Sequence, residues 1–203
     1  MPTNPRFVSG AKALALIVVL GLALTACVTQ PDVAQPDDAL PAPGRTIEAS
    51  ASAVQDLTEY RIAVVVPDDS GESQTLLAAT REFAATSGAE LVEFTADAAG
   101  ADPVGAALEE AVGTHADVVV GLGGGVVEVF DFETSKIIDQ QFLVVGGQLA
   151  EPTENVTAVI WPGATSREPA DEASVTVPRA IDALGAGIGS IRGGTTGIVL
   201  RLG

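Results

Sequence analysis

A few short segments of the sequence carry the residue types that could do chemistry. Two neighbouring carboxylates can hold a metal ion or move a proton, and a glycine run can hold a phosphate on its backbone N–H groups. A tryptophan ring can stack on a ring-shaped ligand. Each of these segments directly follows an apolar stretch. The candidate ligand-binding residues are Asp68, Asp69, Ser70, Gly123, Gly124, Gly147 and Trp161.

The neighbouring carboxylates Asp68 and Asp69 have a structural alternative to catalysis or metal binding. Asp69 precedes a stretch with helical periodicity, so it is expected to cap that helix, and Glu72 would complete a capping-box-like pair. We favour this interpretation, because helix caps are a common role of aspartate in a loop that precedes a helix.

The glycine run from Gly121 to Gly125 departs from the phosphate-binding fingerprints. Val126 stands where G-x-G-x-x-G needs its third glycine, and no Lys-Ser/Thr pair follows as a P-loop would require. The run is therefore predicted to form a tight turn between a strand and a helix, with a ligand-contacting loop as the alternative. For Trp161, stacking on a ligand and capping the core at the rim of a sheet are equally favoured.

No catalytic set can be assembled from the sequence. Its one histidine, His115, precedes a predicted strand and so falls at the edge of the sheet opposite the candidate residues. Ser73 lacks the flanking glycines of a nucleophile elbow, and the one cysteine excludes cysteine-rich metal sites. We expect a protein that is not an enzyme and that needs no cofactor and no metal.

The elements that position the candidates follow from hydrophobic periodicity. Continuous apolar runs of strand length alternate with stretches of helical spacing, which is typical of a parallel sheet with helices on both faces. We predict an α/β fold, a three-layer sandwich with a mainly parallel, flavodoxin-like sheet, over residues 59–203. The expected strands are 61–66, 91–94, 117–120, 142–145, 156–161 and 197–202, and the expected helices follow Gly71, Asp102, Gly125 and Pro178.

The first 26 residues are predicted to be a secretory signal peptide. Arg6 and Lys12 precede an apolar run, 13–24, that is short for a membrane span, and Leu24-Thr25-Ala26-Cys27 is similar to a bacterial lipobox. This similarity implies that Cys27 carries acyl chains and anchors the protein to the cell membrane on its extracytoplasmic side. Residues 27–58 are rich in Pro, Ala and Asp and are predicted to be a tether, with a short helix over 47–57.

The charge balance limits the classes of partner that the protein can bind. The chain has 27 acidic and 10 basic residues and a net charge of −17, which excludes nucleic acid as a partner because polyphosphates bind to basic surfaces. The sequence also resembles bacterial substrate-binding lipoproteins of the basic membrane protein (BMP) family, which have the type I periplasmic-binding fold. The resemblance rests on four segments, at 61–67, 115–124, 141–147 and 155–160.

The BMP resemblance implies capture of a nucleoside-like solute for an ABC importer. By this resemblance Asp68 or Asp69 would contact the ribose, although the loop reads Asp-Asp-Ser-Gly-Glu where the family has Asp-x-Ser-Phe-Asn. Family members have two lobes, and this chain has sequence for one, so a second lobe would have to come from a partner. The alternative is a structural or interaction lipoprotein, outside transport, that kept the fold without ligand binding.

Overall fold

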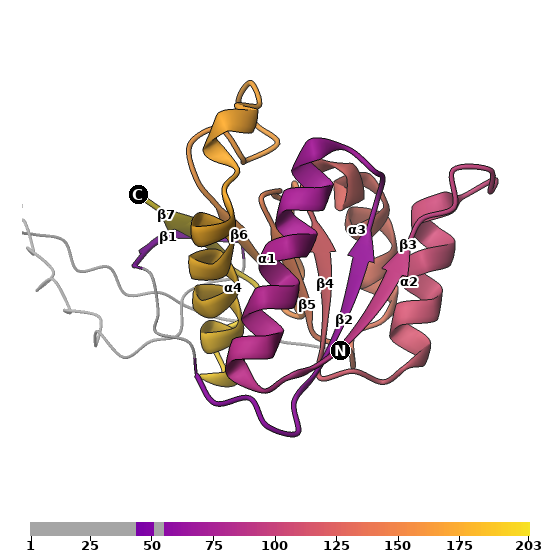
Figure 1. Ribbon diagram of the computed structural model, residues 1–203, viewed down its shortest axis with the longest axis horizontal. Coiled ribbons are helices and arrows are strands. Elements are labelled where there is room, and N and C mark those ends of the chain that lie inside the picture. The colour runs from indigo at the N-terminus through magenta and orange to yellow at the C-terminus, as the bar shows by residue number, and fades with distance from the viewer. Residues whose placement is uncertain (1–43, 51–54) are drawn as a thin grey trace, which may run out of the picture. The chain divides into compact units, whose positions relative to one another are not determined.

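The strands join in one sheet in the computed structural model, which describes residues 44–50 and 55–203. Across these residues the sheet has seven strands in the order β1-β7-β6-β5-β4-β2-β3 (Figure 1). Every neighbouring pair is parallel. The strands are β1 (Thr46–Ala49), β2 (Arg61–Val66), β3 (Glu90–Thr95), β4 (Val118–Leu122), β5 (Phe142–Val145), β6 (Val156–Ile160) and β7 (Val199–Leu202).

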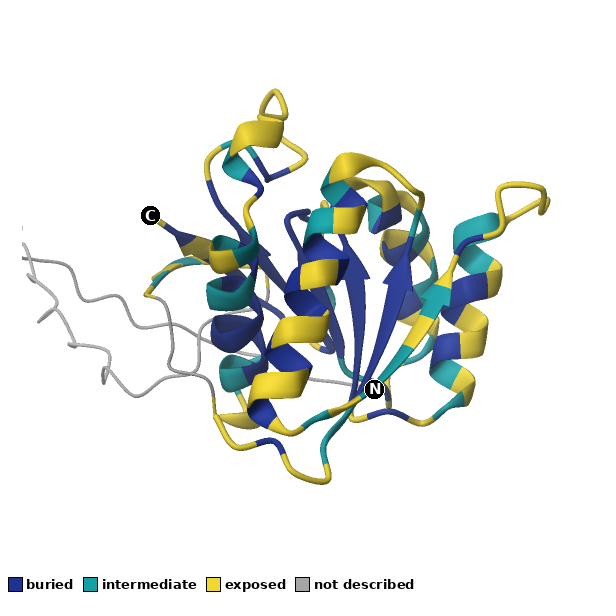
Figure 2. Cartoon of the chain, viewed as in Figure 1, coloured by how far each residue is buried: buried dark blue, intermediate teal, exposed yellow. Residues whose placement is uncertain are grey.

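The central strands are buried on both faces, which explains their continuous apolar sequences. β4, β5 and β6 are buried along their whole length (Figure 2). Because side chains alternate across a strand, β2 supplies Ile62 and Val64 to one core and Ala63 and Val65 to the other. The sheet therefore separates two hydrophobic cores, each of which needs a layer of helices.

Two helices cover each face of the sheet. α1 (Gly71–Ser87) and α4 (Val177–Arg192) pack on one face, whereas α2 (Pro103–Gly113) and α3 (Val127–Glu133) pack on the other (Figure 1). α2 begins as predicted, since the Asp102 carboxylate accepts a hydrogen bond from the Gly105 N–H at 3.1 Å and Pro103 follows the cap. The predicted three-layer α/β fold class is confirmed.

Two local predictions are wrong. Residues 46–49 form the edge strand β1, paired with β7, where a short helix over 47–57 was expected. Thr46 to Ala49 alternate between exposed and half-buried, and this period of two suits a strand, so the sheet includes residues from the segment assigned to the tether. The helix expected after Gly125 stops at Glu133 and continues as a 3₁₀ turn over Thr134–Lys136, which leaves Ile138 exposed instead of inward-facing.

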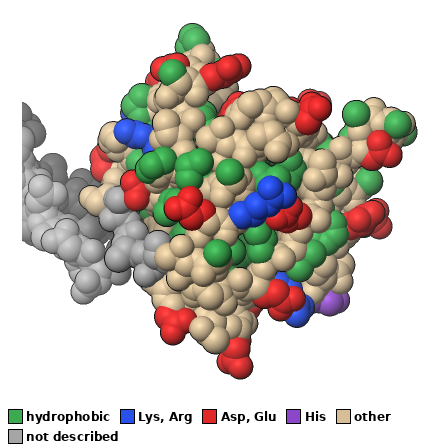
Figure 3. All heavy atoms as spheres, in the orientation of Figure 1, with side chains coloured by type: hydrophobic (Ala, Val, Ile, Leu, Met, Phe, Trp, Pro, Cys, Tyr) green, Lys and Arg blue, Asp and Glu red, His purple; other side chains and the backbone are tan. Residues whose placement is uncertain are grey.

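The predicted signal peptide and the predicted lipid attachment at Cys27 lie outside the described residues. Within the described ranges, none of the helices combines the length and the apolar character that crossing a bilayer requires. The face of the molecule drawn in Figure 3 carries more acidic than basic side chains, in line with the net charge of −17.

Candidate functional site

The strand order defines where a ligand would bind on this fold. Taking β2 as the first strand, β3-β2-β4-β5-β6 is the 2-1-3-4-5 order of doubly wound sheets. Ligands of such sheets bind beyond the carboxyl ends of the strands, at the point where the order reverses. That point lies between β2 and β4, which are followed by Asp68–Ser70 and Gly123–Gly125. The fold therefore brings the two main predicted segments together.

Asp68 is the candidate whose carboxylate lies directly at this switch point. Its Oδ1 accepts hydrogen bonds from the Ser70 N–H at 3.0 Å and from the Ser73 hydroxyl at 2.6 Å. Hydrogen bonds from Ser70 and Ser73 hold the pKa of Asp68 below its ordinary value, so the group is a carboxylate at neutral pH. A Cβ atom on Gly125 would lie 3.6 Å from Asp68 Oδ2, which places this oxygen beside the glycine turn.

The cap of α1 is Ser70, so the predicted capping role of Asp69 is wrong. Ser70 Oγ accepts a hydrogen bond from the Ser73 N–H at 3.2 Å, and Ser70 has the extended backbone of an N-cap residue. Because the helix begins at Gly71, Asp69 stands one residue too early to cap it, and it is exposed. Because Asp69 is not the cap, the expected capping-box pair of Asp69 and Glu72 does not form. The Glu72 side chain instead extends toward the glycine turn.

Glu72 lies against the glycine turn. A Cβ atom on Gly123 would lie 2.9 Å from Glu72 Oε1, so the Glu72 carboxylate lies directly beside the turn. Gly123 has a φ of +70°, which favours glycine, and the chain then tightens into a 3₁₀ turn. The run thus forms the predicted tight turn, and a carboxylate of the chain itself lies against it, where it would repel a bound phosphate.

Glu72→Gln should raise the stability of the protein at neutral pH. Burial, followed by the charge of Asp68, raises the pKa of Glu72, so the folded state disfavours its ionised form. A raised carboxyl pKa means that stability is lost as the pH rises from the unfolded pKa through the folded one. The melting temperature of Glu72→Gln should therefore exceed that of the wild type at about pH 7 and approach it near pH 4 or below. A constant difference at all pH values would contradict this cause.

Gly147 serves to pack two loops together. A Cβ atom on Gly147 would lie 2.7 Å from the Gly123 carbonyl oxygen, so only glycine allows the loops after β4 and β5 to approach so closely. The next amide, Gln148 N–H, donates to Ser166 Oγ at 3.2 Å, and Ser166 has a φ of +64°. Ser166 thus joins the site from the loop after β6. The sequence contains no signal for it, because residues 162–176 have no regular pattern.

Trp161 packs in the core at the rim of the sheet. Its side chain is 1% exposed, and its Nε1–H donates to the Ser174 carbonyl at 3.1 Å. Trp161 also forms an isolated antiparallel bridge with Ala164, which ties down the loop after β6. Of the two predicted roles of Trp161, the structure therefore supports capping of the core. The buried ring presents no open face on which a ligand could stack.

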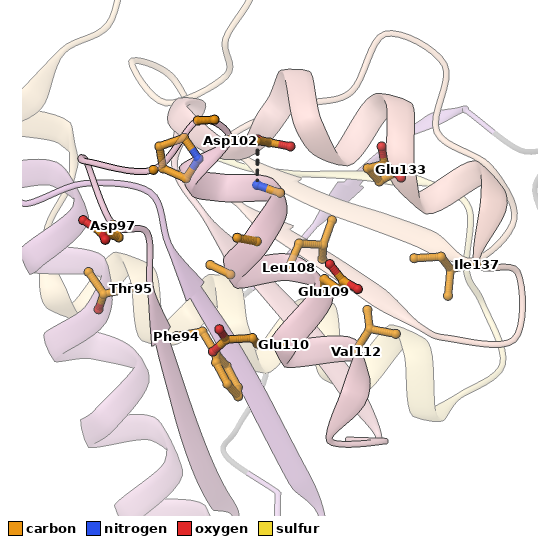
Figure 4. A pocket seen from close by; sticks show the side chains of 16 residues that line it. Phe94, Thr95, Asp97, Asp102, Leu108, Glu109, Glu110, Val112, Glu133 and Ile137 are labelled. Carbon is orange, nitrogen blue, oxygen red and sulfur yellow. Dashed lines mark hydrogen bonds between the residues drawn. The ribbon is translucent and has the colours of Figure 1, made fainter.

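Sequence reasoning missed a cavity of about 670 Å³ around α2. Its apolar lining includes Phe94 of β3, Val112 of α2 and Ile137, and its charged lining consists of carboxylates (Figure 4). None of the predicted candidate residues lines it. The sequence carries no local signal for this cavity, because β3, α2 and the turn after α3 are separate in the sequence and meet only in the folded chain. Ile138, which was expected to point inward, is exposed next to the lining residue Ile137.

Two further features of the described residues concern metal ligands and the histidine. No group of three or more His, Cys, Asp or Glu side chains within the described ranges is placed to hold a metal ion. His115 lies in the turn before β4, at the amino end of the strands, as predicted. It is therefore at the opposite edge of the sheet from Asp68.

Comparisons with known proteins add a likeness of fold. No protein-family model matches the sequence, and no curated protein matches it. An ABC transporter solute-binding protein from Aeropyrum pernix K1 shares 14% identity at a TM-score of 0.45, over 51% of this chain and 29% of that one. One from Conexibacter woesei DSM 14684 shares 16% identity at a TM-score of 0.42, over 50% of this chain and 35% of that one.

A transcriptional activator of the comK gene from Bacillus halodurans shares 14% identity at a TM-score of 0.42, over 71% of this chain and 53% of that one. The match thus spans about a third of the two solute-binding proteins and about half of the activator. At such identities the likeness concerns the fold alone. The class of this protein follows from its own sheet, which makes it a single flavodoxin-like lobe with its candidate site at the switch point.

Proposed function

We propose that this protein is a lipid-anchored extracytoplasmic lipoprotein whose α/β lobe binds a small polar solute at the switch point. The observation that carries the proposal is the position of the ionised Asp68 beside the Gly123–Gly125 turn, between the carboxyl ends of β2 and β4. Both hydrogen bonds to Asp68 from the described residues end on Oδ1. Oδ2 is therefore left to accept hydrogen bonds from a ligand.

The ligand class that suits this arrangement is a neutral polyhydroxy solute. An exposed carboxylate oxygen accepts hydrogen bonds from a sugar diol, whereas Asp68 and Glu72 together would repel a phosphate. The BMP resemblance adds the nucleoside as the specific ligand and an ABC importer as the partner. Because Trp161 is buried, a nucleoside base would have to stack on a group from another chain, as a second lobe would supply.

Binding without catalysis is part of the proposal. Ser73 donates to Asp68, but the histidine that would complete a catalytic set lies at the other edge of the sheet. The Ser70, Ser73 and Asp68 cluster is accounted for by the capping of α1. The membrane location rests on the lipobox-like segment that ends at Cys27.

Thermal unfolding of the full chain in a nonionic detergent with a panel of nucleosides tests the proposal. A ligand at 100 times its Kd adds about 2.7 kcal/mol of stability, which shifts the melting temperature by several degrees. Asp68→Asn should abolish the shift, whereas Asp69→Asn, which removes an exposed neighbouring charge, should retain it. A shift that survives in Asp68→Asn would contradict the assigned site.

The second candidate function is an interaction lipoprotein that binds no small solute. Glu72 favours it, since the carboxylate of this side chain already lies against the glycine turn. A folded wild-type protein with no shift for any nucleoside would support this alternative. Acylation of Cys27 is tested separately, by the mass of the protein recovered from bacterial membranes and by its loss in Cys27→Ala.

A further inference from the structure

The charged residues that line the cavity around α2 are all acidic. Its charged residues are Asp97, Asp102, Glu109, Glu110 and Glu133, with no lysine, arginine or histidine among the lining residues. Glu109 and Glu110 are exposed on α2. Figure 4 shows Glu109, Val112 and Ile137 near one another, with Phe94 and Glu110 toward the strand β3. The groove thus combines an apolar floor with a negative rim.

Two large apolar side chains that are next in sequence to lining residues are exposed. Ile138, next to the lining residue Ile137, is 70% exposed, and Phe132, next to the lining residue Glu133, is 65% exposed. These two side chains add exposed apolar area beside the groove, to which a partner could bind. In the described residues the edge strand β3, which supplies Phe94, pairs only with β2.

A lysine side chain of the chain itself, Lys136, contacts the carboxylate and the aromatic ring next to the groove. Lys136 Nζ lies 3.5 Å from the centroid of the Phe132 ring and 3.0 Å from Glu133 Oε1. The pair of a carboxylate and an aromatic face is a favourable site for a Lys or Arg side chain. The other carboxylates of the groove offer the same attraction to cations from outside the chain.

We propose that the groove around α2 binds a basic segment of a partner protein, in which Lys or Arg side chains alternate with apolar ones. The basic groups would meet Glu109, Glu110 and Asp97, and the apolar groups would cover Ile137 and Ile138. The lining from Asp102 to Val112 is about 15 Å long along the helix, which an extended segment of about four or five residues spans. This surface is separate from the switch point.

A labelled peptide of alternating lysine and leucine tests the proposal by fluorescence polarisation with the full chain in a nonionic detergent. The peptide should bind, and a glutamate–leucine peptide should not. Glu109→Gln with Glu110→Gln should weaken binding about threefold or more. Glu48→Gln with Glu82→Gln removes the same charge from exposed positions on β1 and α1 and should have less effect. Ile138→Ser should also weaken binding.

Three results would overturn the inference. Absence of binding by the lysine–leucine peptide is the first, and an equal loss in both double variants is the second, since it would indicate attraction to the net charge alone. The third is self-association of the peptide-free protein that Ile138→Ser abolishes, because a second copy of the chain would then occupy the groove. As a control, the melting curve of each variant should match that of the wild type, because the substituted positions are exposed.

Discussion

Trp161→Ala is expected to lower the free energy of unfolding by about 3–5 kcal/mol. The indole is 1% exposed and lies in the core that α1 and α4 cover, so its removal leaves a large cavity beneath the loop after β6. It also removes the hydrogen bond to the Ser174 carbonyl. Urea unfolding followed by far-UV circular dichroism measures the loss, because the variant has no tryptophan left for fluorescence.

The matched variant for this position is Trp161→Phe. It keeps most of the buried ring but loses the Nε1–H donor, so it should destabilise less than alanine does. If Trp161→Ala left stability unchanged and instead abolished a nucleoside-induced shift, the ring would belong to a binding site and its placement in the core would be wrong. The two substitutions together therefore separate packing from ligand contact.

Gly187→Ala should destabilise the protein by about 1–3 kcal/mol, although alanine favours helices over glycine. A Cβ atom on Gly187 would overlap Leu143 Cδ1 and would lie 3.1 Å from Val159 Cγ2, and both of these side chains are fully buried on the sheet. The helix α4 would have to move away from β5 and β6 to admit the methyl group. Thermal or urea unfolding of the variant measures this cost.

Gly189, two residues further along α4, provides the control. A Cβ atom there would lie 3.1 Å from Gln55 Nε2, the end of a flexible exposed side chain that can move aside. Gly189→Ala should therefore be neutral or stabilising by up to about 1 kcal/mol. Equal destabilisation by both substitutions would show that the helix tolerates no alanine for reasons other than contact with the sheet.

The two proposals use different parts of one lobe. The switch point offers Asp68 and backbone groups to a small solute, whereas the groove around α2 offers carboxylates and apolar side chains to a partner. A nucleoside-induced shift lost in Asp68→Asn bears on the first alone. Loss of peptide binding in the Glu109 and Glu110 variant bears on the second alone, so either proposal can fail while the other stands.

The sequence by itself determined the fold class and the edge of the sheet where the candidates meet. β2, β4, β5 and β6 are buried on both faces, so their apolar runs are continuous and stand out from the amphipathic helices. Asp102-Pro103 marked the start of α2 for a similarly local reason, since capping depends on neighbouring residues alone. Parallel strands then require that Asp68 and Gly123 lie at the same edge.

Only the tertiary structure decided how the candidate residues are used. Whether Trp161 is buried depends on Ser174 and Ala164, which reach it through an irregular loop. Glu72 contacts a glycine turn that lies about 50 positions further along the chain, and the groove around α2 is assembled from three separate elements. Such contacts join residues distant in sequence, and local periodicity carries no information about them. The short strand β1 was missed because an alternation over four residues is a weak signal, and its pairing with β7 at the far end of the chain stabilises it.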